Sequence, residues 1–170
     1  IQNESDAEVS VSVQQTVYEQ DGTKPVATGE KTAVQSVPAG QSLEITDKIT
    51  VAEPKLWSTD SPAMYTVRTD VYDGVKLVDS YDTDFGFRWT EFNTSNGFFL
   101  NGENMKLRGV CMHHDQGALG SEAWYRSIER QVEMLKEMGV NAIRVTHNPA
   151  SEALIDICNR KGIMLVEEFF

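Results

Sequence analysis

The first half of the chain alternates apolar and polar positions with a period of two. In residues 7–18, valine alternates with serine or glutamine, and turn signals such as Asp21-Gly22 and Asp73-Gly74 follow such runs. The comparable runs are residues 26–37, 43–51, 64–72 and 75–85. This pattern is typical of antiparallel strands with one solvated face. It predicts an immunoglobulin-like β-sandwich, with Trp57 as the large side chain that fills its core.

The second half changes to a β-α-β-α-β pattern. Asn101-Gly102 indicates a tight hairpin. Apolar runs at 107–112, 140–146 and 163–166 predict three strands. Because short links join them to the intervening helices, these strands are expected to be parallel.

Two helices are expected between these strands. Ser121 and Ser151 are the predicted N-caps, and Gly139 and Gly162 are the predicted ends. The apolar stripe of the first helix comprises Trp124, Ile128, Val132, Leu135 and Met138.

Two domains are therefore predicted, a sandwich over residues 1–90 and an α/β part over residues 91–170. The polar stretch 93–96 is interpreted as the linker between them. With 170 residues, the chain is too short for a complete eight-fold α/β barrel, which needs about 250.

Composition excludes several classes of protein. Fifteen basic and 26 acidic residues give a net charge of −11, which argues against a nucleic-acid partner. No apolar run approaches the roughly 18 residues of a membrane span, so no membrane partner is expected. Two cysteines are too few for a disulfide framework.

Polar residues follow all three predicted parallel strands. His113 and Asp115 come after the first, His147 after the second, and Glu167-Glu168 end the third. Ligands of parallel α/β sheets bind beyond the carboxyl ends of the strands, so these residues predict a shared polar pocket. A single histidine there would more often be an ordinary surface or core residue, but all three histidines of the chain fall at this edge.

Arg144 alternates with Ile143 and Val145 and is therefore expected on the sheet face away from the helices. If that face is enclosed, the guanidinium needs an anion, because it cannot lose its charge. Glu168 is the candidate partner. A purely structural ion pair is the alternative interpretation.

No metal or cofactor is expected. His113 and His114 are adjacent on an extended chain and point to opposite sides, and no zinc-type spacing occurs. Cys111 lies within an apolar strand, where an inert thiol is more usual than a nucleophile. No glycine-rich phosphate-binding loop is present.

Several motifs resemble family 2 glycoside hydrolases, and most of all their β-galactosidase-like members. The motifs are Phe85-Gly86-Phe87-Arg88, Gly97-Phe98-Phe99-Leu100-Asn101-Gly102, Leu107-Arg108-Gly109-Val110, Asn141-Ala142-Ile143-Arg144, Thr146-His147-Asn148-Pro149 and Glu167-Glu168. The resemblance implies an immunoglobulin-like domain followed by the start of a (β/α)8 TIM barrel.

The resemblance also implies an enzyme that cleaves terminal β-linked sugars with retention. That chemistry uses two glutamates about 5–5.5 Å apart, as acid/base and nucleophile. In the family both lie on later strands, so they are expected after Phe170, and this chain alone is expected to be inactive.

Carried over to this sequence, His113 corresponds to a histidine near the reacting sugar. Asp115 and His147 correspond to residues that contact the sugar. Arg144 matches an arginine that lies against the nucleophile, and Glu168 contributes pocket polarity or pairs with Arg144.

The expected partners are a β-linked oligosaccharide or glycoside and the rest of the same polypeptide, with self-association left open. Galactosides, glucuronides and mannosides all fit the resemblance. It favours a bacterial periplasmic or extracellular location and leaves a cytoplasmic one open. The competing hypothesis is a non-catalytic carbohydrate-binding or interaction module.

Overall fold

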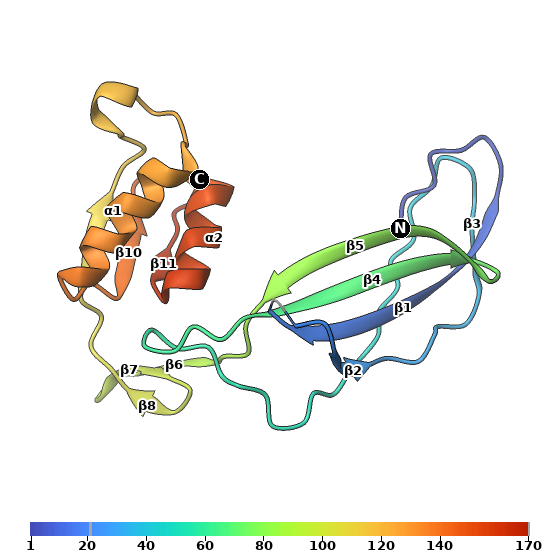
Figure 1. Ribbon diagram of the computed structural model, residues 1–170, viewed down its shortest axis with the longest axis horizontal. Coiled ribbons are helices and arrows are strands. Elements are labelled where there is room, and N and C mark those ends of the chain that lie inside the picture. Colours follow the sequence, from blue (N-terminus) through green and yellow to red (C-terminus); the bar gives the residue numbers. More distant parts are fainter. Residues whose placement is uncertain (21, 170) are drawn as a thin grey trace. The chain divides into compact units, whose positions relative to one another are not determined.

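Figure 1 shows the protein as a computed structural model, which describes residues 1–20 and 22–169. The chain forms two compact units. The first comprises Ile1–Pro54 and Tyr65–Phe85, and the second comprises Lys55–Met64 and Gly86–Phe170. The segment from Lys55 to Met64 therefore belongs with the second half of the chain. Of the predicted Asp21-Gly22 turn, Asp21 lies outside the described residues.

The first unit is the predicted immunoglobulin-like domain. Its strands are β1 (Val9–Glu19), β2 (Pro25–Thr28), β3 (Gln35–Val37), β4 (Tyr65–Asp73) and β5 (Lys76–Phe85). The antiparallel order is β2-β1-β4-β5, and β3 also pairs with β1. Val13 lies opposite Val71 and Val17 opposite Val67, so the apolar positions of β1 and β4 share one face. The period-two pattern thus predicted both strands correctly.

Two strand predictions in this unit were wrong. Residues 43–51 form no strand, and the nearest pairing is an isolated bridge between Gln2 and Ser42. Residues 26–37 divide into β2 and β3. Alternation reports which side of a segment is covered, but it does not show whether a neighbouring strand supplies ladder hydrogen bonds.

Trp57 is buried, but in the second unit and not in the sandwich core where it was predicted. It packs with Met64, Leu100, Ala142 and Met164. Its indole N–H donates to the carbonyl of Asn159 at 2.7 Å. Through this packing and this hydrogen bond, the indole holds the segment Lys55–Met64 against the α/β part of the chain.

Over its described residues, the second unit contains two small sheets and two helices. The antiparallel sheet consists of β6 (Thr90–Asn93), β7 (Gly97–Leu100) and β8 (Glu103–Asn104). The parallel sheet consists of β9 (Gly109–Met112), β10 (Ala142–Val145) and β11 (Met164–Val166). Its strand order is β11-β10-β9. The helices are α1 (Tyr125–Glu137) and α2 (Glu152–Lys161), and a 3-10 turn spans Gly117–Leu119. This is the predicted β-α-β-α-β order, the start of a TIM barrel.

The stretch 93–96 is not a linker. It is the turn between β6 and β7, in which Asn93 Oδ1 accepts hydrogen bonds from the backbone N–H groups of Ser95 and Asn96. The next turn was predicted correctly: Asn101 and Gly102 have positive φ angles of 54° and 84° and join β7 to β8.

Both helices pack on one face of the parallel sheet (Figure 1). Ser151 caps α2 as predicted, because its hydroxyl accepts a hydrogen bond from Leu154 N. Ser121 caps nothing: α1 begins at Tyr125, with Trp124 in the cap position and no side-chain cap. Among the described residues, no helix is long and apolar enough to cross a membrane. The buried side chains of this layer are Ile128, Val132, Val140, Ile143, Val145, Leu154, Ile157, Cys158 and Ile163.

Candidate active site

Arg144, Glu168 and His147 form a hydrogen-bonded cluster where β10 and β11 end. Arg144 Nε donates to Glu168 Oε1 at 2.7 Å, and Arg144 Nη2 donates to the same oxygen. The other carboxylate oxygen, Oε2, lies 2.7 Å from His147 Nδ1. The carboxylate of Glu168 therefore joins the cation of one strand to the imidazole beyond its end.

Strand pairing explains why these groups meet. Arg144 pairs with Val166 on β11, two residues before Glu168, and with Cys111 on β9. Its neighbours Ile143 and Val145 are fully buried beneath the helices, so the alternation of β10 directs Arg144 to the opposite face. The predicted partnership between Arg144 and Glu168 is present in the structure.

The setting of Arg144 differs from the prediction of an enclosed face. Its side chain is 49% exposed, compared with 24% for Glu168. The three parallel strands described here carry helices on one face only, so the other face is open at this end. Burial alone therefore does not force the ion pair, which forms because the two strands place the groups within reach.

The cluster holds Glu168 as an anion. Hydrogen bonds from His147 and Arg144 lower the pKa of the Glu168 carboxyl below its ordinary value. The same contact with Glu168 raises the pKa of Arg144. An ionised carboxylate that accepts hydrogen bonds from two residues is suited to orienting its neighbours and poorly suited to acting as a general acid.

The two strand-end histidines lie together. The rings of His113 and His147 are 5.9 Å apart between centroids and meet edge to face. The peptide bond between Thr146 and His147 is cis. His113, His147, Arg144 and Glu168 thus converge, as their positions at the ends of parallel strands predict.

Asp115 is the predicted residue that the structure does not place in this cluster. Its Oδ1 atom accepts the backbone N–H of Gly117 at 2.8 Å, and its backbone carbonyl accepts a hydrogen bond from Gln131. Within the described part of the chain, Asp115 contacts none of the four clustered side chains through a hydrogen bond or ion pair. In this structure it organises its own loop.

Glu167 is a residue whose contribution the sequence analysis did not recognise. Its Oε1 atom accepts the backbone N–H of Ala150 at 2.9 Å and so ties the loop after β10 to the end of β11. Adjacent residues of an extended chain point to opposite sides. From the sequence alone, this alternation could have been used to predict that Glu167 and Glu168 contact different parts of the structure.

The two cysteines have different surroundings. Cys158 is buried in the helical layer, and desolvation raises the pKa of its thiol to about 12. Cys111, predicted to be an inert thiol, is exposed, and its Sγ lies 3.9 Å from Arg144 Nη1. Among the described residues, no group of three histidine, cysteine, aspartate or glutamate side chains could hold a metal ion.

Comparison with known proteins places both halves in one family. The model described as "Glycosyl hydrolases family 2" matches residues 1–88. The model described as "Glycosyl hydrolases family 2, TIM barrel domain" matches residues 93–169. Together the two matches cover most of both compact units.

Individual relatives support the same family assignment. The chain is 39% identical over 168 residues to the beta-galactosidase BoGH2A of Bacteroides ovatus, an alignment that covers 99% of this chain and 19% of that protein. A glycosyl hydrolase family 2 structure from Bacteroides cellulosilyticus superimposes with a TM-score of 0.89 at 34% identity, covering 96% of this chain and 22% of that one. A beta-glucuronidase structure from Bacteroides uniformis gives a TM-score of 0.87 at 32% identity, covering 98% and 20%.

The chain spans about one fifth of the length of these relatives. Within that span, the immunoglobulin-like domain and the parallel β-α units both correspond to one family. The chain belongs to glycosyl hydrolase family 2, of which it contains an immunoglobulin-like domain and the first part of the TIM barrel domain.

Proposed function

We propose that the protein containing this chain is a retaining exo-β-glycosidase and that the chain supplies one side of its sugar pocket. The observation that carries the proposal is the joining of Arg144, Glu168 and His147 at the carboxyl ends of β10 and β11. In TIM barrels this end of the strands forms the active site. Membership of the family supplies the reaction class.

In this proposal the chain binds and orients, while other parts of the protein do the bond cleavage. The His113 and His147 rings border the sugar and offer nitrogen atoms to its hydroxyl groups. Arg144 keeps Nη1 directed away from Glu168, toward Cys111, and is the cation that faces the nucleophilic carboxylate. Asp115 joins as a sugar ligand only if its loop rearranges on binding.

Glu168 is proposed as the positioning residue of this pocket and not as one of the two catalytic glutamates. A retaining enzyme needs an acid/base that is protonated when the leaving group departs. The contacts that lower the pKa of Glu168 oppose that role. The acid/base is therefore assigned to a residue outside 1–170. The family resemblance places the nucleophile on a later strand as well, and the chain by itself is proposed to be inactive.

A terminal β-galactoside is the proposed substrate. The relative with 39% identity over almost the whole chain is named a beta-galactosidase, whereas a relative from Formosa agariphila with 44% identity over a shorter alignment of 124 residues is named a putative beta-glucuronidase. The proposal follows the longer alignment. A galactoside and a glucuronide differ in the carboxylate at C6 and in the orientation of the C4 hydroxyl, so the pocket's charge and hydrogen-bonding groups at those two positions decide between them.

The test compares chromogenic β-galactoside, β-glucuronide and β-mannoside as substrates of the whole protein. The expected result is the highest kcat/KM for the galactoside, with the β-anomer appearing first by NMR. The 170-residue chain is assayed beside it and should release no chromophore. Turnover by the short chain would contradict the assignment of catalysis elsewhere, and sugar binding without turnover by the whole protein would favour a non-catalytic carbohydrate-binding module.

A further inference from the structure

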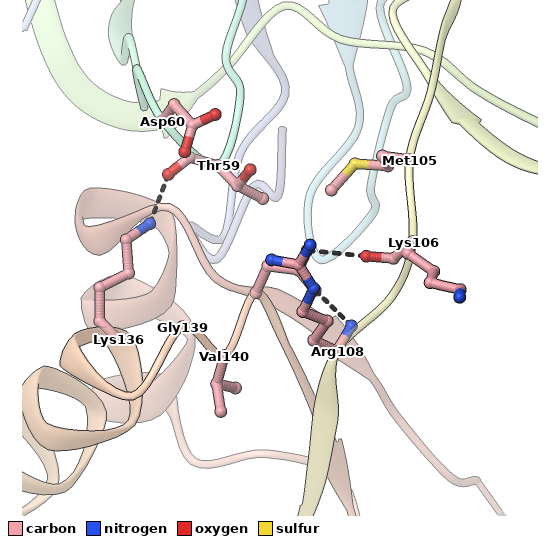
Figure 2. Close-up of a pocket in the computed structure, with 9 residues that line it drawn as sticks. Thr59, Asp60, Met105, Lys106, Arg108, Lys136, Gly139 and Val140 are labelled. Carbon is pink, nitrogen blue, oxygen red and sulfur yellow. Dashed lines mark hydrogen bonds between the residues drawn. The ribbon is translucent and has the colours of Figure 1, made fainter.

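A second hollow lies at the opposite end of the parallel strands from the Arg144 cluster. It has a volume of about 330 Å³ and opens beside the residues that precede β9 and β10 (Figure 2). Side chains from three segments border it, namely Thr59, Asp60, Met105, Lys106, Arg108 and Lys136. Because the sugar pocket is proposed at the carboxyl ends of the strands, this hollow needs a separate explanation.

The hollow collects positive charge in an acidic protein. Lys106, Arg108 and Lys136 border it against one carboxylate, Asp60, although acidic residues outnumber basic ones by 26 to 15 in the whole chain. In the part of the chain that the structure describes, the side chains of Lys106 and Arg108 form no ion pair or hydrogen bond. By contrast, Arg126, Arg144 and Lys161 of the same unit all pair with carboxylates.

Lys136 adds a partly desolvated donor. Its ammonium group donates to the carbonyl oxygens of Thr59 and Gly162, the first of which is drawn in Figure 2. Burial lowers the pKa of Lys136. An ammonium has three N–H donors, so two carbonyl contacts leave one for a ligand. An anion in the hollow would also offset the cost of desolvating this charge.

The basic segments are held in a fixed arrangement. The Asn141 side chain donates through Nδ2 to the carbonyl of Lys106 at 2.9 Å and accepts the backbone N–H of Arg108 through Oδ1 at 2.8 Å. The backbone N–H of Asn141 donates in turn to the carbonyl of Arg108 at 3.0 Å. These bonds fix the two chain segments before a ligand arrives, which reduces the entropy lost on binding.

We propose that this hollow binds a phosphate group, either as the free ion or carried by a small metabolite. A tetrahedral dianion presents oxygens in several directions and can meet the guanidinium of Arg108 and the ammonium of Lys136 together, whereas the ammonium of Lys106 is directed away from the hollow (Figure 2). The volume is near the lower limit of small-molecule sites, roughly 300–1,000 Å³, so it admits a phosphate and a small organic group attached to it. The inference is independent of the proposed glycosidase activity, because the site lies at the other end of the barrel strands.

The test is isothermal titration calorimetry of the whole protein with inorganic phosphate and, separately, with a hexose phosphate, at constant ionic strength against chloride. Saturable binding is expected. Tighter binding of the hexose phosphate assigns a metabolite, and equal binding assigns the free ion. Arg108→Gln should weaken binding roughly tenfold, the usual effect of losing one charge-assisted hydrogen bond.

Two further variants keep the test decisive. Asp60→Asn should tighten phosphate binding, a change that a misfolded variant would not mimic. Lys76→Gln removes a lysine on β5 of the other compact unit, which contributes no residue to the lining of the hollow, and should leave the affinity unchanged. Absence of saturable binding, or equal weakening by Arg108→Gln and Lys76→Gln, would overturn the proposal.

Discussion

The carboxylate of Glu168 accepts two N–H groups of Arg144, one of them Nε at 2.7 Å, across neighbouring parallel strands. The contact fixes the plane of the guanidinium, because two of its nitrogens bind one oxygen. It leaves the third nitrogen, Nη1, free of Glu168. Glu168 thus sets the direction in which the remaining donor of Arg144 points.

Replacing Glu168 by glutamine should lower kcat/KM of the whole protein by about tenfold or more, because charge-assisted hydrogen bonds contribute roughly 1.5–3 kcal/mol. The glutamine has the same shape but cannot hold Arg144 and His147 by charge. Chromogenic substrate kinetics measure the effect. Glu137→Gln, an exposed carboxylate at the end of α1, is the matched control and should retain full activity. Equal rates for both variants would refute the positioning role.

The same residue predicts a pH dependence of stability. The folded pKa of Glu168 is depressed, so its contribution is present above the unfolded pKa, near 4.3, and is lost as pH falls through the lower folded value. Urea unfolding of the wild type and Glu168→Gln between pH 7 and pH 3 should show a difference in free energy of unfolding that shrinks below about pH 4. A difference that grows on acidification would have the wrong sign.

Trp57 and Trp124 provide a matched pair for the core of the second unit. Trp57→Ala should reduce the free energy of unfolding by about 3–5 kcal/mol, since it empties a buried position and leaves the carbonyl of Asn159 without its donor. Trp124 is 59% exposed, and Trp124→Ala should cost much less. Urea denaturation followed by circular dichroism measures both. Similar losses would contradict the placement of Trp57.

Ser151 and Ser121 form a second matched pair. Ser151→Ala should destabilise the protein by about 1 kcal/mol, because the hydroxyl that accepts the N–H of Leu154 is lost. Ser121→Ala should change stability by less than about 0.5 kcal/mol, since Ser121 lies before the start of α1. The denaturation midpoints compare the two directly, and a larger effect at Ser121 would show that α1 begins earlier.

Short-range patterns predicted the second unit well. The alternation around Arg144 placed it opposite the helices, and the order of strands and helices placed His147 and Glu168 at the same end. Asn101-Gly102 predicted its hairpin because few residues adopt positive φ. The prediction for Ser121 was wrong because a serine before an apolar stripe caps a helix only if the helix begins directly after it, and α1 begins at Tyr125.

The sequence by itself determined the period of each half, the parallel β-α order, the pairing of Arg144 with Glu168 and the family. Only the tertiary structure decided that Trp57 packs with the barrel strands, that residues 43–51 remain outside any ladder, and that Asp115 turns to its own loop. Those outcomes depend on which distant segment supplies the partner atoms. Local alternation indicates that a side chain is buried, but which distant residues bury it depends on the three-dimensional packing.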